Sequence, residues 1–177
     1  QTVNDQSFSG LLYVLTAGIH VPNPSELLSS DTFKEYMKVL KQNFDFIIID
    51  CPPSLSMLTI NAMTTADSVL VPIQCEYYAL EGLSQLIHTI ELVKERLNPV
   101  LSIEGVVFTM YDARTNLSLQ VVENVKDNLN QNIYKTIIPR NIRLAEAPSY
   151  GMPINQYDSK SAGAESYRLL ADEAINK

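Results

Sequence analysis

A carboxylate follows an unbroken apolar run and stands just before two prolines. Residues 46–49 read Phe-Ile-Ile-Ile, Asp50 comes next, and Pro52 and Pro53 follow. Apolar runs without polar alternation are typical of strands buried on both faces of a parallel sheet. We therefore expect Asp50 at the carboxyl end of such a strand, the edge where open α/β sheets bind their ligands. A carboxylate held there can bind Mg²⁺, directly or through water.

The same residues also have an interpretation without a ligand. An Asp side chain often accepts hydrogen bonds from its own turn. Two prolines end a hydrogen-bonded strand and stiffen its exit. For a bare pattern of four apolar residues and one acid, this structural interpretation is the more frequent one. The stretch Cys-Pro-Pro-Ser at residues 51–54 and the residues after it favour the ligand-binding interpretation over the structural one.

Further candidate residues follow other predicted strands. Pro139, Arg140 and Asn141 come after one strand, and Met110 comes after another. The planar guanidinium of Arg140 can stack on a flat ligand or donate hydrogen bonds to it. Met110 has an equally simple interpretation, because methionine commonly fills gaps in apolar cores. Residues 74–78 also follow a strand, and we expect them to shape the ligand site or a dimer face.

The strands and helices that position these residues are predicted to alternate along the chain. Short runs rich in Val, Ile and Phe predict strands at residues 11–15, 45–50, 68–72, 102–109 and 134–138. Apolar residues at three- and four-residue spacing predict helices at residues 25–41, 55–65, 80–97, 117–129 and 161–175. This alternation predicts a single α/β domain over residues 1–177, with a mostly parallel sheet and helices on both faces.

The composition agrees with one globular domain and disfavours several other classes. The chain has 177 residues, 46% of them hydrophobic, and a net charge of −7. No apolar run approaches the length of a membrane span, and no signal-peptide pattern is present. Two cysteines without a secretion signal fit a reducing cytosol, so we expect a cytoplasmic protein. The negative charge argues against a DNA-coated surface, although Arg114, Arg140 and Arg143 could form a local basic patch.

Several longer stretches occur in a defined order along the chain. They are residues 45–54 (DFIIIDCPPS), 58–62 (LTINA), 74–84 (QCEYYALEGLS), 109–117 (TMYDARTNL), 138–141 (IPRN) and 146–149 (EAPS). With these stretches, the sequence from Phe44 onward resembles the ParA/Soj family of chromosome- and plasmid-partition ATPases. The ordered set is more specific than any one motif. The resemblance implies a P-loop NTPase fold, ATP hydrolysis, and ATP and Mg²⁺ as cofactors.

The resemblance also implies a role for each candidate residue at the nucleotide. Asp50 corresponds to the Walker B acid, which places Mg²⁺ at the γ-phosphate, directly or through water. Pro52 and Pro53 correspond to a switch region whose backbone senses that phosphate. Residues 139–141 correspond to the segment that packs against the purine, and Met110 is a further candidate for the same pocket.

Macromolecular partners follow from the same resemblance. Arg114 and Arg143 match positions that the family uses for sequence-independent DNA binding, whose affinity falls steeply with salt. Both also have a simpler interpretation as ordinary surface arginines. The family forms an ATP-dependent homodimer, associates with the nucleoid and is stimulated by a ParB-like protein. The last predicted helix lacks the basic and strongly apolar faces of a membrane-targeting helix, so we expect no membrane partner.

One motif of the family is absent from this sequence. No Gly-x-x-x-x-Gly-Lys-[Ser/Thr] occurs, and the six glycines are all isolated. A phosphate cradle needs adjacent backbone N–H groups in a glycine-permitted turn, together with a lysine. We therefore expect the domain to be incomplete at its N-terminus, with a gap in the sheet where the P-loop strand would lie. Truncation, a degraded gene and a separately encoded half remain open, and we expect this chain to be inactive by itself.

Residues 11–30 carry a second resemblance. Residues 11–18 (LLYVLTAG) and 22–30 (PNPSELLSS) are similar to bacterial tyrosine autokinases of capsule and exopolysaccharide assembly. The C-terminal tyrosine cluster of those kinases is absent, and only Tyr77 and Tyr78 are adjacent. Two alternatives to a partition ATPase therefore stay open. One is a cytoplasmic autokinase module, and the other is a non-catalytic interaction module.

Overall fold

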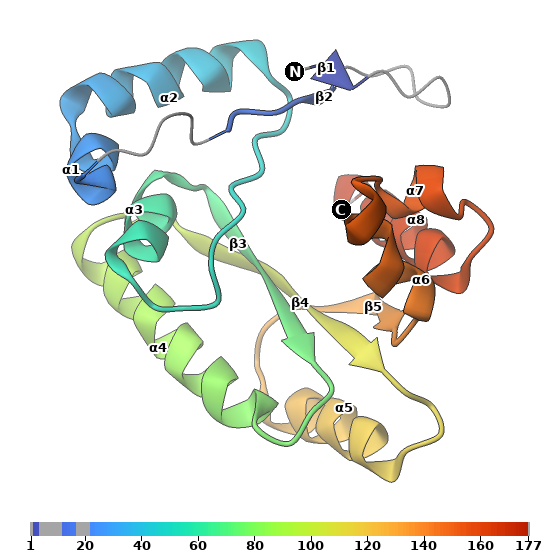
Figure 1. The fold of residues 1–177 in the computed structure, drawn as a ribbon. Coiled ribbons are helices and arrows are strands. Elements are labelled where there is room, and N and C mark those ends of the chain that lie inside the picture. Colours follow the sequence, from blue (N-terminus) through green and yellow to red (C-terminus); the bar gives the residue numbers. More distant parts are fainter. Residues whose placement is uncertain (1, 4–11, 17–21, 177) are drawn as a thin grey trace.

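The computed structural model describes residues 2–3, 12–16 and 22–176. Its centre is a parallel sheet of β3 (Ser68–Gln74), β4 (Ser102–Tyr111) and β5 (Ile133–Pro139), in the order β3-β4-β5 (Figure 1). These strands confirm the predictions at residues 68–72, 102–109 and 134–138. Gln74 pairs with Thr109 near the ends of β3 and β4, and Tyr111 pairs with Pro139 at the ends of β4 and β5. All three strands therefore finish at one edge of the sheet.

Helices cover the two faces of this sheet. On one face lie α3 (Met57–Thr65), α4 (Ala79–Arg96) and α5 (Asn116–Asn128), and on the other lies α8 (Ala162–Ile175). Alternate residues of β4 serve the two layers, as expected for a strand. Val106 and Phe108 belong to the core shared with α4 and α5, whereas Val107 packs with Tyr134 and Ile138 beneath α8.

The helix predicted at residues 25–41 is divided into two. They are α1 (Pro24–Ser29) and α2 (Asp31–Asn43). Ser30 separates them, because its extended backbone ends α1 and its hydroxyl caps α2 by accepting the Phe33 N–H at 3.2 Å. The remaining elements are β1 (Thr2–Val3), β2 (Leu12–Tyr13), α6 (Ile142–Glu146), the 3₁₀ helix η1 (Ala147–Tyr150) and α7 (Ile154–Tyr157).

The strand predicted at residues 45–50 is not formed. These residues run as an irregular segment from α2 to α3 (Figure 1), and 91% of Ile48 and 69% of Phe46 are exposed. The apolar pattern is that of a buried strand, but a strand also needs a neighbour for its backbone N–H and C=O groups. No described strand pairs with this segment. The expectation that Asp50 ends a strand is therefore wrong for this chain.

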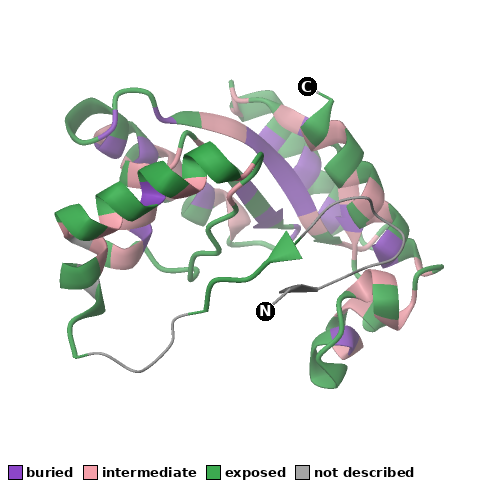
Figure 2. Ribbon diagram, turned by 90° about the horizontal axis from the view of Figure 1, so that it is seen from above, coloured by how far each residue is buried: buried purple, intermediate pink, exposed green. Residues whose placement is uncertain are grey.

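The sheet is also unpartnered at β3. The strand order leaves one edge of β3 without a hydrogen-bonded neighbour among the described residues. Val71 and Ile73 are buried beneath the helices, but Leu70, on the opposite face of the strand, is 43% exposed. Figure 2 shows burial concentrated in the sheet and on the inner sides of its helices, while the N-terminal part is mostly exposed. The gap expected in the sheet stays a prediction.

Two further findings concern the N-terminal part and the helices. The strand predicted at residues 11–15 is reduced to β2, which pairs antiparallel with β1, and residue 11 lies outside the described residues. Throughout the described parts of the chain, the helices are too short or too polar to cross a lipid bilayer.

Candidate functional site

A cavity lies where the three strands end. Its volume is about 610 Å³, and it opens between the residues that follow β3 and those that follow β4, with Arg140 after β5. Its lining comprises Cys75, Glu76, Tyr77, Tyr78, Met110, Asp112, Arg114, Thr115, Leu117, Ser118 and Arg140. Parallel strands thus bring residues that are more than sixty positions apart in sequence to one opening. The cavity has aromatic and apolar walls with charged groups of both signs.

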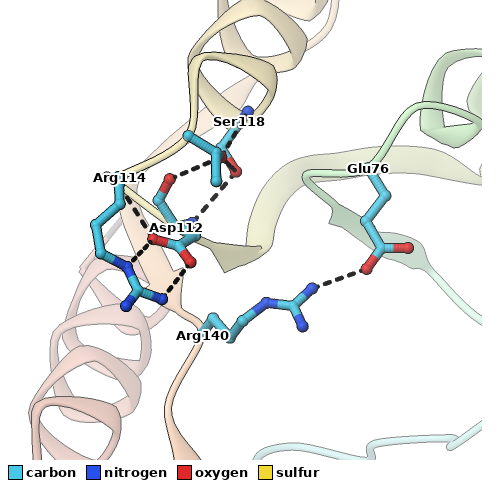
Figure 3. A network of polar contacts seen from close by, with 6 residues as sticks. Glu76, Asp112, Arg114, Ser118 and Arg140 are labelled. Carbon is cyan, nitrogen blue, oxygen red and sulfur yellow. Dashed lines mark hydrogen bonds and ion pairs between the residues drawn. The ribbon is translucent and has the colours of Figure 1, made fainter.

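Arg140 reaches across this opening to Glu76. Its Nη2 donates to Glu76 Oε1 at 2.9 Å, and the pair joins the end of β5 to the end of β3 (Figure 3). The backbone N–H of Arg140 is fixed separately, because it donates to the Tyr111 carbonyl at 2.8 Å. Both charged side chains remain about half exposed. An exposed pair of this kind contributes little to stability, so a ligand can replace Glu76 at small cost.

Asp112 holds Arg114 at the neighbouring strand end. Asp112 Oδ1 accepts the Nε–H of Arg114 at 2.8 Å and its backbone N–H at 3.0 Å, and Oδ2 accepts Nη2 at 2.7 Å (Figure 3). The hydrogen bonds from the Arg114 side chain, followed by the one from its backbone, hold the pKa of Asp112 far below its usual range. Asp112 therefore stays ionised throughout the ordinary pH range.

Met110 has an unusual backbone at the rim of the cavity. Its φ is +55°, and no other described residue except Gly151 has a positive φ. An L-residue in this left-handed region is strained by about 1 kcal/mol. The register of β4 and β5 shifts at the same place, between Phe108 and Tyr111. Met110 is 41% exposed, so the structure places it at the cavity rather than in the core.

The residues predicted at the phosphate end lie apart from this cavity. Asp50 is exposed, and neither Asp50 nor Pro52 lines a described cavity. Pro53 lines a second cavity of about 440 Å³, where it meets residues around the start of α4, including Glu76 and Tyr78. The described residues contain no cluster of three or more His, Cys, Asp or Glu side chains that could hold a metal. A lone carboxylate such as Asp50 fits Mg²⁺ that takes its other ligands from phosphate and water.

The residues after β5 serve local structure as well. Pro139 ends β5, and Asn141 caps α6 because its Oδ1 accepts the Arg143 N–H at 2.8 Å. Arg143 lies on α6 outside the cavity, where Glu146 binds it at 2.9 Å and Asp158 at 3.4 Å. The structure therefore brings Arg114, Met110 and Arg140 together, and it does not bring Asp50, Asn141 or Arg143 to that cavity.

Sequence reasoning missed Asp112 as a site residue, whereas Glu76 belongs to residues 74–78, which were expected to shape the ligand site or a dimer face. Glu76 and Asp112 follow β3 and β4 closely, so they occupy the position that marked Asp50 as a candidate. The signal was present, since acids just beyond predicted strands are expected at the ligand edge of the sheet. The signal at Asp112 is weaker than at Asp50, because Thr109 interrupts the apolar residues that precede Asp112.

Comparisons with known proteins identify the family of this chain. Residues 12–103 match the model of a family described as an AAA domain. The Bacillus subtilis sporulation initiation inhibitor protein Soj is 61% identical over 140 residues, which cover 79% of this chain and 55% of Soj. The chromosome partitioning protein ParA of Myxococcus xanthus is 52% identical over 156 residues, which cover 86% and 55%. The chain belongs to the ParA/Soj family. It spans about half the length of these ParA/Soj relatives.

A solved structure supports the fold of this ParA/Soj chain. Cobyrinic acid a,c-diamide synthase from Mycobacterium smegmatis, with a bound ATP analog and magnesium, matches with a TM-score of 0.67 at 35% identity. The match covers 85% of this chain and 56% of the synthase. The predicted α/β P-loop NTPase fold class is confirmed. The resemblance of residues 11–30 to tyrosine autokinases stays a prediction, and residues 11 and 17–21 lie outside the described residues.

Proposed function

We propose that this chain forms the purine-binding and DNA-binding part of a ParA/Soj partition ATPase. The observation that carries the proposal is the cavity at the strand ends, where Met110 and Arg140 lie together, as their motifs in the family would require. The apolar side chain of Met110 and the flat guanidinium of Arg140 suit a planar base. Membership of the family and the ATP analog in the synthase support the same ligand.

Mg²⁺ and the phosphates belong to a different part of the proposed site. Asp50 would hold Mg²⁺, directly or through water, and the metal would neutralise negative charge on the phosphates of ATP. The exposed segment at residues 46–50 and the free edge of β3 leave room for a further strand. We place the phosphate-binding loop of the complete protein on a strand that pairs with both, because the sequence has no Gly-x-x-x-x-Gly-Lys motif of its own.

The proposal extends to assembly and location. ATP binding would drive formation of a homodimer, in which Arg114 and Arg143 contact DNA phosphates without regard to sequence. Both arginines are exposed, with 86% and 54% of their side chains accessible, so both can reach a phosphate. A ParB-like protein would stimulate hydrolysis. The complete protein would then reside in the cytoplasm on the nucleoid.

Calorimetry of Mg-ATP binding tests the proposal. We expect the complete protein to bind Mg-ATP and this chain by itself to give no heat. Asp50→Ala should weaken the magnesium-dependent part of binding by the complete protein. Asp45→Ala is the matched control, because Asp45 is an exposed acid of the same segment. Binding by this chain alone, lost in Asp50→Ala, would show that a phosphate cradle exists within it and would overturn the proposed division of the site.

A further inference from the structure

The Arg114 guanidinium is occupied on only one of its two hydrogen-bonding edges. The Nε–Nη2 edge faces the Asp112 carboxylate in a bidentate ion pair. Nη1 has no hydrogen-bond partner among the described residues, and the Arg114 side chain is 86% exposed. Figure 3 shows the guanidinium lying against Asp112, at some distance from the Arg140–Glu76 pair. A guanidinium can bind a second oxyanion through its remaining edge without releasing the first.

We propose that Asp112 is a positioning residue for DNA binding. Its carboxylate holds Arg114 so that the remaining edge of the guanidinium meets a DNA phosphate. This inference rests on the proposed function, and it adds an acid that none of the sequence motifs had marked for DNA contact.

Asp112 is itself anchored at the start of α5. Its backbone N–H donates to Ser118 Oγ at 3.2 Å, and its carbonyl accepts the Thr115 hydroxyl at 3.0 Å. Thr115 in turn caps α5 by accepting the Ser118 N–H at 3.3 Å. Only 16% of the Asp112 side chain is exposed. Asp112, which orients Arg114, is therefore fixed in place by its hydrogen bonds to the start of α5.

Two opposing effects decide whether Asp112 strengthens or weakens DNA binding by Arg114. An arginine that is already held loses less conformational freedom when a phosphate binds, which favours binding. The negative charge of Asp112 repels the same phosphate, which disfavours it. Because the guanidinium keeps a free edge and high exposure, we infer that positioning outweighs repulsion. Arg143 is held by Glu146 and Asp158 in a similar way, so carboxylate support is shared by both predicted DNA-binding arginines.

The test is DNA binding by the complete protein with Mg-ATP, at several salt concentrations. Anisotropy of a short labelled duplex would be measured for Asp112→Asn, Arg114→Ala and the double variant. Asparagine keeps an oxygen for the Arg114 backbone N–H but loses the charge and the bidentate pair. The control is Glu123→Gln, which removes the same charge from an exposed position on α5. Thermal unfolding would establish that each variant is folded.

Arg114→Ala should lower the affinity and reduce the slope of log affinity against log salt by about one. Asp112→Asn should lower the affinity roughly threefold to tenfold with an unchanged slope, since a freed side chain must be ordered on binding. Glu123→Gln should not lower the affinity. The double variant should bind no more weakly than Arg114→Ala, because Asp112 acts only through Arg114.

The remaining outcomes separate the two proposals. An unchanged affinity in Arg114→Ala, or no DNA binding at all, would refute the proposed DNA contact, and the role of Asp112 would fall with it. If Arg114→Ala weakens DNA binding but Asp112→Asn strengthens it, Asp112 opposes the contact between Arg114 and phosphate. That result would refute Asp112 as a positioning residue. Asp112→Asn could also lower the DNA affinity by the same factor in the parent protein and in the Arg114→Ala variant. The substitution would then act on the structure in general and not through Arg114, which would also overturn the inference.

Discussion

At the scale of residues, the charged groups of the cavity differ in how firmly they are held. Asp112 is bound by three hydrogen bonds from Arg114 and is mostly buried. Among the described residues, the Arg140 side chain donates a hydrogen bond to one partner, the half-exposed Glu76. A group with one exposed ion pair is easily released, whereas a carboxylate held by several donors is not. Arg140 is therefore the cation that can turn from its protein partner to a ligand.

Removal of Arg140 should selectively weaken binding of the base. In the complete protein, Arg140→Ala should lower the affinity for Mg-ATP about fivefold to tenfold, the amount expected for a cation stacked on or bonded to a ring. The affinity for Mg-tripolyphosphate, which has no base, should be unchanged. Calorimetry with both ligands makes the comparison. An equal loss for the two ligands would contradict the assignment of Arg140 to the purine.

The buried thiol of Cys75 should make stability depend on alkaline pH. Burial raises its pKa from the ordinary value of 9.0 to about 11. Between these values the unfolded chain binds fewer protons than the folded chain, so the free energy of unfolding falls as pH rises. Urea unfolding from pH 8 to pH 10.5 would measure this decline, with Cys75→Ala as the comparison. Parallel pH profiles of the two proteins would count against a buried neutral thiol.

At the scale of elements, two glycines show how tightly strands and helices pack. A Cβ on Gly105 of β4 would lie 2.7 Å from Tyr134 Cε2 of β5, which is shorter than any normal contact. A Cβ on Gly82 of α4 would meet nothing within 4 Å. The same substitution should therefore act in opposite directions at the two positions.

Gly105→Ala should destabilise the fold by about 1–3 kcal/mol, because the added methyl group displaces the buried Tyr134 ring. Gly82→Ala should stabilise it by about 0.5–1 kcal/mol, since alanine loses less backbone freedom than glycine within a helix. Urea unfolding of the two variants beside the parent chain measures both values. Stability losses of equal size would mean that local packing around Gly105 is looser than described.

At the scale of the whole molecule, one side of the fold is open. Helices cover both faces of β4, and backbone N–H groups of the edge strand β5 donate to Glu173 of α8. At the other edge of the sheet, β3 has no paired strand among the described residues, and Leu70 is 43% exposed. The apolar segment at residues 46–50 is exposed as well. Apolar surface of this kind marks a place where further protein packs. In our proposal, the strand of the phosphate-binding loop occupies it.

A charged residue in the exposed segment should be harmless here and harmful in the complete protein. Ile48→Asp should change the unfolding free energy of this chain by less than about 0.5 kcal/mol, because Ile48 is 91% exposed. In the complete protein it should cost more than about 2 kcal/mol, since a buried charge would have no partner. Val100→Asp, at a residue that is 76% exposed, should be neutral in both. Chemical denaturation provides the comparison, and a neutral Ile48→Asp in both proteins would exclude a strand at this position.

Much of the fold and part of the site follow from local sequence. Strands β3, β4 and β5 and helices α4, α5 and α8 were predicted, because hydrophobic periodicity is a local property of the chain. Arg140 and Met110 were predicted at the ligand edge because each follows a predicted strand; in the structure Arg140 follows β5, and Met110 lies near the end of β4. The Asp112–Arg114 pair is also local, since its members are two residues apart.

Other features of the fold and the site depend on tertiary structure, namely the state of residues 46–49 and the contact between Arg140 and Glu76. The run at residues 46–49 has the composition of a buried strand, but burial and hydrogen bonding depend on neighbours that may come from anywhere in the chain. Here no described strand lies beside it, and the run is exposed. Arg140 and Glu76 are 64 residues apart, and only the parallel order of β3, β4 and β5 brings them within 2.9 Å.

The sequence by itself determined most of the elements that form and the family to which the chain belongs. The pairing of strands determined which side chains meet and which edge stays open, because pairing is set by contacts between distant segments.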